Sequence, residues 1–89
     1  MRAVISVLGK DRTGILAFVS TRCADRWVNI EDVTQKVLDD LFGMIMIVTI
    51  PDDLDNFHSF VQEMEEEGKK VGLSIHVMHE DIFNAMHTI

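Results

Sequence analysis

A six-residue loop bounded by two glycines separates a strand-like segment from a helix-like segment near the start of the chain. The strand-like segment, Val4–Leu8, is apolar and rich in β-branched residues, and Ile15–Val19 has apolar residues at helical spacing. A loop between a strand and a helix presents unpaired backbone N–H groups and the positive end of a helix dipole, which favours a bound carboxylate or phosphate. The alternative is a plain turn, in which the glycines give backbone freedom and Thr13 caps the helix. The loop sequence is Gly9-Lys10-Asp11-Arg12-Thr13-Gly14.

The hydropathy pattern of the whole chain predicts the order strand, helix, strand, strand, helix, strand. The natural packing of this order is an α+β sandwich of the βαββαβ type, with a four-stranded antiparallel sheet and both helices on one face. The predicted strands are Arg2–Leu8, Asn29–Leu38, Phe42–Ile50 and Leu73–His79, with a hairpin loop at Asp39–Leu41. The predicted helices run from Gly14 to Arg26 and from Asp52 or Asp53 to Lys70.

The first predicted helix has one apolar stripe. Ile15, Val19 and Cys23 recur at steps of four residues, with Leu16 and Trp27 beside them. We expect Cys23 to serve as a small buried hydrophobe rather than a nucleophile. We expect Trp27 to pack where the helix meets the next strand.

The second predicted helix places a glycine on its apolar face. Gly68 on that face lets the helix approach its neighbour closely, whereas the competing interpretation makes it a helix C-cap. The first interpretation is favoured, because Gly72 supplies a stop of its own. The apolar stripe consists of Phe57, Val61, Met64, Gly68 and Val71.

The strand Phe42–Ile50 is apolar on both faces, with Ile45 and Ile47 on the face opposite Met44 and Met46. An antiparallel strand over a one-layer core normally has a polar outer face. A surface other than the two helices is therefore expected to cover the second apolar face of this strand, and we predict at least a homodimer. Pro51 ends the strand.

The C-terminal tail, residues 80–89, is expected to form a short helix docked on the body or on a partner. Its apolar residues at helical spacing are Ile82, Phe83, Met86 and Ile89. A metal cluster of His76, His79, Glu80, Asp81 and His87 is disfavoured, because residues three apart in a strand point to opposite faces. Catalysis is also not expected, since no nucleophile elbow or oxyanion hole accompanies Ser20, Asp55 and His58.

Length and composition set further limits. The 89 residues allow one domain, here residues 1–79, followed by the tail. The formal net charge of -7 opposes direct nucleic-acid binding. The longest apolar stretch, Phe42–Ile50, is too short for the ~20 residues of a membrane-spanning helix, so no membrane partner is expected. One cysteine and no leader-like segment favour a cytoplasmic protein, and nothing indicates a cofactor.

Two segments together resemble a known family. Gly9–Ala17, followed by Val28-Asn29-Ile30, resembles the ACT domain, a small amino-acid-sensing regulatory module, over about residues 2–79. The chain is most similar to the short stand-alone ACT proteins related to the glycine-cleavage-system transcriptional repressor. Its segment Phe83-Asn84-Ala85-Met86-His87 resembles the tail of an uncharacterised bacterial and archaeal subgroup.

The resemblance implies a ferredoxin-like fold and a regulatory module that acts, as a homodimer or larger oligomer, on a partner protein. Two ACT domains usually pair, and an amino acid binds between them. On this chain the backbone from Gly9 to Gly14 would receive the carboxylate. Asp11 and Asn29 would lie near the amino group or hold the loop, and Ile15 and Ile30 would form the apolar floor. Thr13 stands where the family often has proline. The alternative is a ligand-free dimerisation or protein-interaction module.

Overall fold

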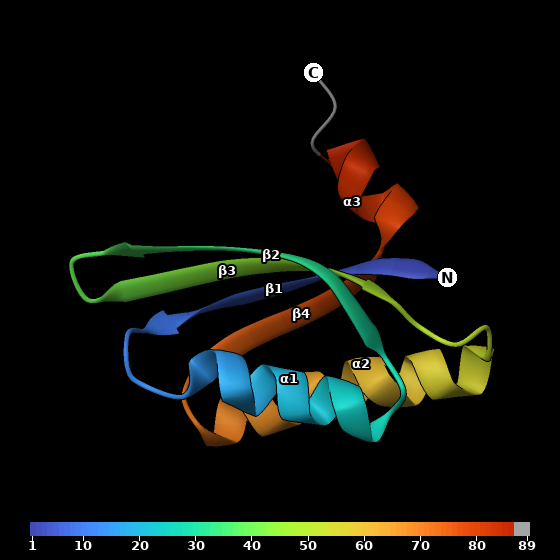
Figure 1. Cartoon of the computed structure of the whole chain (residues 1–89), viewed down its shortest axis with the longest axis horizontal. Coiled ribbons are helices and arrows are strands. Elements are labelled where there is room, and N and C mark those ends of the chain that lie inside the picture. The colour runs from blue at the N-terminus through green and yellow to red at the C-terminus, as the bar shows by residue number, and fades with distance from the viewer. Residues whose placement is uncertain (87–89) are drawn as a thin grey trace.

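The computed structural model describes residues 1–86, which form a four-stranded antiparallel sheet and three helices. The strands lie in the order β2-β3-β1-β4, with α1 and α2 on one face and α3 rising from the end of β4 on the other side (Figure 1). This confirms the predicted sandwich and element order. The elements are β1 (Arg2–Lys10), α1 (Ile15–Asp25), β2 (Asn29–Leu38), β3 (Leu41–Thr49), α2 (Leu54–Lys70), β4 (Leu73–His79) and α3 (Glu80–Met86).

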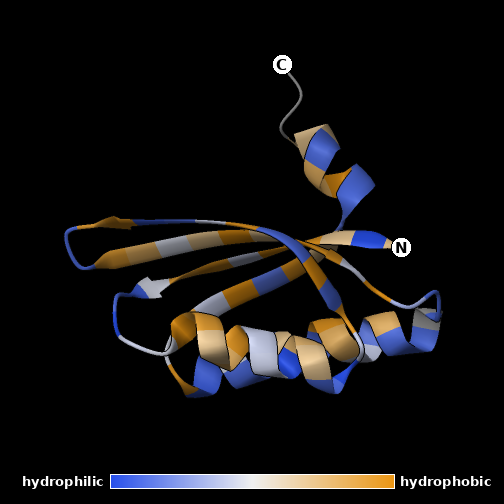
Figure 2. Cartoon of the chain, in the orientation of Figure 1, coloured by the Kyte–Doolittle hydropathy of each residue, from blue (hydrophilic) through white to orange (hydrophobic). Residues whose placement is uncertain are grey.

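The core lies between the sheet and the two long helices. Alternate strand residues point toward the helices, as the two-residue period of a strand requires. Figure 2 shows hydrophobic and hydrophilic residues alternating along the strands and helices. Phe60 is fully buried on α2, beside the predicted stripe, so the buried face of α2 is wider than predicted. The core includes Ala3, Ile5, Val7, Val19, Cys23, Met44, Met46, Val48, Phe60 and Met64.

Two glycines of the α2–β4 region have the roles that the sequence predicts. A Cβ atom on Gly68 would lie 2.8 Å from Cγ1 of Ile75 and 2.9 Å from the carbonyl oxygen of Leu73, so only glycine allows this approach of α2 to β4. Gly72 has a φ of 77° and turns the chain out of the helix. At the other end of α2, the Asp53 side chain accepts hydrogen bonds from two backbone N–H groups and caps the helix.

Two predictions at the ends of α1 are wrong. The N-cap is Gly14, with a φ of 86° and no side-chain hydrogen bond, so Thr13 lies one residue too early to cap the helix. Trp27 is 86% exposed rather than packed. Its φ of 60° turns the chain sharply after α1, and Val28 takes the buried position instead.

Strand ends also differ from the prediction. β1 continues through Gly9 and Lys10, which pair with Phe42 and Leu41, so the loop before α1 shortens to residues 11–14. The hairpin between β2 and β3 turns in two residues rather than three, and Asp39 adopts a φ of 56° there. At both places the strands extend further than predicted, because strand pairing satisfies backbone hydrogen-bonding groups that a longer loop would leave unpaired. In the tail, residues 80–86 are helical as predicted, and His87 and Ile89 lie outside the described residues.

Candidate functional site

The shortened loop at residues 11–14 is held from two sides. The backbone N–H of Asp11 donates a hydrogen bond of 2.6 Å to the carbonyl oxygen of Asp40, in the β2–β3 turn. The guanidinium of Arg12 donates a hydrogen bond of 2.5 Å to the carbonyl oxygen of Val71, in the turn after α2. All four loop residues are nevertheless exposed to solvent. The loop is therefore anchored and accessible at the same time.

The two glycines of this region serve different purposes. A Cβ atom on Gly9 would lie 2.7 Å from Cδ2 of Leu73 and 3.2 Å from the carbonyl oxygen of Gly72, so Gly9 permits close packing of β1 against the start of β4. Gly14 has open space around it and supplies a positive φ. The first backbone N–H groups of a helix have no intrahelical acceptor, and at Gly14 no side chain caps them. These groups can bind a carboxylate.

The other predicted ligand-binding residues lie at the opposite end of the sheet. Gly9 pairs with Phe42, whereas Asn29 pairs with Thr49 at the far end of β3. Seven residues of β3 at ~3.3 Å each place the two ends roughly 23 Å apart. Asn29 is exposed and Ile30 is half-buried. One chain therefore does not bring Asn29 and Ile30 to the loop.

Ile15, the remaining predicted residue of the apolar floor, belongs to the core between α1 and the sheet. Its position as the first residue of α1 accounts for this placement, because the apolar stripe of α1 begins with it. Lys10 is exposed at the end of β1. The loop thus offers charged side chains and backbone N–H groups rather than an apolar surface.

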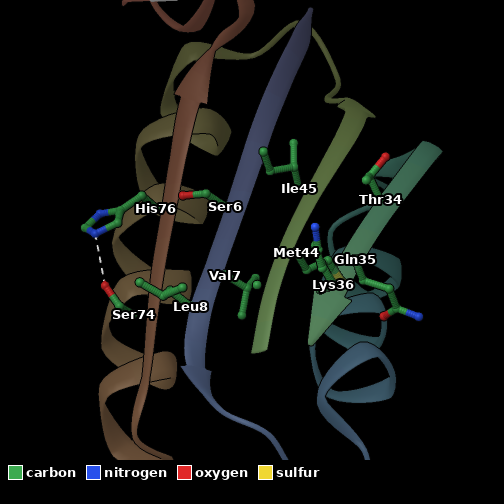
Figure 3. Close-up of a pocket in the computed structure, with 11 residues that line it drawn as sticks. Ser6, Val7, Leu8, Thr34, Gln35, Lys36, Met44, Ile45, Ser74 and His76 are labelled. Carbon is green, nitrogen blue, oxygen red and sulfur yellow. Dashed lines mark hydrogen bonds between the residues drawn. The ribbon is translucent and has the colours of Figure 1, made fainter. Parts of the chain in front are cut away.

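A second candidate site is a hollow on the sheet face that α1 and α2 leave uncovered. It has a volume of about 500 Å³ and crosses all four strands (Figure 3). The strand register places Ile45 beside Ser6 and Thr34, and Gly43 beside Leu8 and Lys36. The absence of a side chain at Gly43 deepens the centre of the face. The sequence predicts this uncovered apolar face from β3 but not its polar residues, which come from the other strands.

The centre of this hollow is apolar and its margin is polar. Leu8 is 52% exposed and Ile45 is 43% exposed, which is unusual for large apolar side chains in the middle of a sheet. At the β4 margin, the Ser74 hydroxyl and Nε2 of His76 form a hydrogen bond of 3.2 Å (Figure 3). Lys36 lines the opposite margin. The face is suited to contact with another apolar surface.

The serine and cysteine side chains that the sequence offers for catalysis have structural roles in α1. The Ser20 hydroxyl donates to the carbonyl oxygen of Leu16 within α1. Burial raises the pKa of the Cys23 thiol to about 11, so the reactive thiolate is scarce at neutral pH. In the part of the chain that the structure describes, no group of three or more His, Cys, Asp or Glu side chains has an arrangement that could hold a metal ion. No helix among residues 1–86 is long and apolar enough to cross a membrane.

Comparison with known proteins decides the family. The family model of the ACT domain matches residues 2–78. The chain belongs to the ACT domain family. ACT domains are regulatory ligand-binding modules, and residues 2–78 contain both the anchored loop and the uncovered sheet face. The resemblance of Gly9–Ala17 and Val28–Ile30 to the ACT domain is therefore confirmed.

Relatives of similar length show the subgroup of this ACT domain protein. It is 44% identical over 88 residues to the UPF0237 protein MJ1558 of Methanocaldococcus jannaschii, covering 99% of this chain and 98% of that protein. It is 43% identical over 89 residues to the UPF0237 protein SMU_72 of Streptococcus mutans, covering 100% of both. It is therefore similar to short stand-alone ACT proteins.

Solved structures agree with the fold. An ACT domain protein from Streptococcus pneumoniae superposes with a TM-score of 0.82 at 38% identity, covering 98% of both chains. A formyltetrahydrofolate deformylase from Pseudomonas putida superposes with a TM-score of 0.79 at 12% identity, covering 91% of this chain and 29% of the deformylase. At that identity the second likeness concerns the fold alone. The ACT fold thus occurs both by itself and as part of a longer enzyme.

Proposed function

We propose that this ACT domain binds an amino acid, or a similar small carboxylate, at a site shared between two copies of the chain, and thereby regulates a partner protein. One observation carries the proposal: the ligand-binding residues expected of the family are divided between opposite ends of one sheet. Asn29 pairs with Thr49, while Gly9 pairs with Phe42. A two-fold arrangement of two antiparallel sheets brings such opposite ends together. The cytoplasm is the expected compartment, since the single cysteine allows no internal disulfide.

Pairing of the two β2 edges supplies this arrangement. β2 hydrogen-bonds only to β3 and so forms one edge of the sheet. Antiparallel pairing of two β2 strands about a two-fold axis at Thr34 sets Asp32 opposite Lys36 of the partner subunit, an oppositely charged cross-strand pair. The same pairing brings Asn29 to the Leu38–Asp40 end of the partner subunit. Asp40 is the residue whose carbonyl oxygen anchors Asp11.

The chemistry at this junction suits a zwitterion. The ligand carboxylate accepts hydrogen bonds from the uncapped first turn of α1, where the helix dipole adds to the attraction. The exposed carboxylate of Asp11 attracts the ligand ammonium group. Asn29 of the partner subunit adds an amide that can donate to the carboxylate or accept from the ammonium group. Ile30 of the partner subunit provides apolar contact for the side chain.

A thermal-shift screen of the twenty standard amino acids tests ligand binding. A ligand at about 100 times its Kd adds roughly 2.7 kcal/mol to the stability of the folded state. We expect one amino acid, or a few related ones, to raise the Tm. Asp11→Ala with Asn29→Ala should abolish the rise and leave the dimer intact, whereas Glu66→Ala, an exposed change on α2, should retain it.

Mixed dimers test whether the site is shared. A dimer of one Asp11→Ala chain and one Asn29→Ala chain contains one site in which both residues are intact, provided that the two residues come from different chains. We therefore expect half of the wild-type ligand stoichiometry in isothermal titration calorimetry. If both residues of a site came from the same chain, every site in the mixed dimer would lack one of them, and no binding would be recovered.

The alternative is a ligand-free dimerisation or protein-interaction module. The exposed apolar centre of the uncovered face, with Leu8 and Ile45, favours this second function, because such a surface gains from contact with another protein. No Tm change with any of the twenty amino acids, together with an intact dimer, would support it and reject the sensor.

A further inference from the structure

The edge strand β4 lacks the features that usually protect an exposed edge from pairing. β4 pairs only with β1, and its register with β1 is unbroken from Leu73 to His79. It contains no Lys, Arg, Asp, Glu or Pro. β2, the other edge, has a bulge between Ile30 and Asp32 and carries charged residues. Bulges, charges and prolines are common protections of an edge. They restrict β2 to strands that match its charges, as a second β2 strand does, and β4 is the edge more open to other strands.

A groove follows the β4 edge, with α2 as its wall. One part, of about 400 Å³, lies along Gly72–His76. The other part, of about 380 Å³, lies along Val77–His79 and is largely apolar. Glu65 lines both parts and so lies near the middle of the groove. Ile82, at the start of α3, is 56% exposed and extends the apolar part.

The residues of the α2 wall are spaced to match a strand. Phe57, Val61, Glu65 and Lys69 line the groove and follow each other at steps of four residues. Four residues of an α-helix rise about 6 Å. Alternate residues of a β-strand, which point to the same side, are roughly 6.6 Å apart. A strand added to β4 would therefore place successive same-side residues near successive residues of this wall.

We propose that the groove between β4 and α2 binds an extended segment of another protein as a fifth strand of the sheet. Backbone hydrogen bonds to the open edge of β4 supply affinity that is independent of sequence, and side chains facing α2 supply specificity. The segment carries two apolar residues and then a basic residue at alternate positions, which face Phe57, Val61 and Glu65. An acidic residue at the next alternate position faces Lys69. The Gly72 end of this groove adjoins the loop before α1, where Gly9 packs against Leu73, but the proposal does not depend on ligand binding there.

Charge decides between a foreign segment and a second copy of this chain. Antiparallel pairing of two β4 strands about a two-fold axis at His76 would bring Glu65 of each copy to the same level across the interface, because Glu65 lies beside the middle of β4. Like charges at that level oppose self-pairing. A basic side chain at the same level is attracted to Glu65 instead.

The test uses two synthetic peptides on the full chain. The first has the sequence Ile-Thr-Val-Thr-Lys-Thr-Glu with blocked termini, and the second exchanges its Lys and Glu. Each peptide is also made with its sequence reversed, so that both parallel and antiparallel pairing with β4 are tested. Backbone amide signals of β4 and α2 are followed by NMR during titration. We expect the first pattern to bind about fivefold more tightly than the second, which is the effect of a surface ion pair.

Two variants provide matched controls. Glu65→Lys should abolish the preference between the two peptides, because each peptide then forms one attractive and one repulsive pair with positions 65 and 69. Glu66→Lys, which makes the same charge change at an exposed neighbour, should leave the preference unchanged. A peptide with N-methyl groups on the backbone nitrogens that face β4 should not bind, because it cannot donate to the edge. Absence of binding at millimolar peptide, signal changes outside β4 and α2, or a preference that persists in Glu65→Lys would each overturn the proposal.

Discussion

The guanidinium of Arg12 donates a hydrogen bond to the backbone carbonyl oxygen of Val71, which lies 59 residues further along the chain. This contact connects the loop before α1 to the turn that follows α2. The opposite side of the loop is tied to the β2–β3 turn through Asp11 and Asp40. The loop therefore owes its position to two turns that are remote in sequence.

Arg12→Ala should loosen the loop without unfolding the protein. The hydrogen bond is exposed, so we expect a loss of at most about 1 kcal/mol in the free energy of unfolding. Hydrogen exchange should accelerate at residues 11–14, because one of the two anchors is gone. Mass spectrometry of exchange measures this directly. Arg2→Ala, which removes an arginine from the other end of β1, is the control, and equal exchange rates in wild type and Arg12→Ala would contradict the anchoring role.

Gly68→Ala should destabilise the fold by about 1–3 kcal/mol. Alanine has the better helix propensity, by roughly 1 kcal/mol, but its Cβ would lie 2.9 Å from the carbonyl oxygen of Leu73, a backbone atom that cannot rotate away. Urea unfolding followed by circular dichroism measures the difference. Glu66→Ala, on the exposed face of the same helix, should change the stability little. An unchanged or raised midpoint for Gly68→Ala would show that β4 can shift to make room.

The fold follows from the sequence where periodicity determines which face a residue takes. The burial of Gly68 and Cys23 was predictable because each falls on an apolar helical stripe, and the face of a helix is fixed by its period. Trp27 and Thr13 were placed wrongly because backbone dihedral angles decided their positions. The positive φ values of Trp27 and Gly14 belong to single residues and leave no periodic signal.

The candidate site was predictable only in part. The loop itself is evident from its glycines, and its exposure follows from its charged residues. The distance between the loop and Asn29 depends on how β1, β2 and β3 align, and hydropathy does not specify this register. The proposed site also takes residues from two copies of the chain, which a motif in one sequence does not distinguish. The β4 groove has no sequence motif, because it arises where an edge strand meets a helix.

Cys23 should make stability fall at alkaline pH. Burial raises the pKa of its thiol from 9.0 to about 11, so the folded state retains the proton when the unfolded state begins to lose it. The resulting stabilisation is fully present below pH 9 and is lost as the pH rises through 11. The difference in unfolding free energy between wild type and Cys23→Ala should therefore shrink between pH 9 and pH 11. A difference that stays constant over this range would show that the thiol ionises equally in both states.

Glu67 should titrate below the usual range of a glutamate. Hydrogen bonds from Lys70 and, to a smaller extent, Arg22 lower the pKa of its carboxyl group. Ionised Glu67 thus stabilises the folded state at neutral pH, and this contribution is lost as the pH falls through the lowered pKa. An NMR titration of the side-chain carboxyl carbon measures the pKa. Lys70→Ala should raise it and Lys69→Ala should not, since Lys70 is the partner at 3.0 Å.

Charge reversal on β2 tests the proposed dimer interface. In antiparallel pairing about Thr34, Asp32 lies opposite Lys36 of the partner subunit. Lys36→Asp or Asp32→Lys alone would then place like charges opposite each other at two positions of the interface, so both single variants should dissociate more readily than wild type. Analytical ultracentrifugation measures the dimer constant.

The double variant Asp32→Lys with Lys36→Asp should restore dimerisation, because it exchanges the two charges and leaves each pair attractive. Restoration separates a specific pairing from general sensitivity of the exposed strand to its charges. Ile45→Ser tests the alternative interface, the uncovered face of the sheet. Ile45 lies at the apolar centre of that face and away from the β2 edge. A dimer that survives both single reversals but dissociates with Ile45→Ser would place the interface on the uncovered face. Asn29 would then not meet the loop at residues 11–14 of the partner subunit, and the shared ligand site would be rejected.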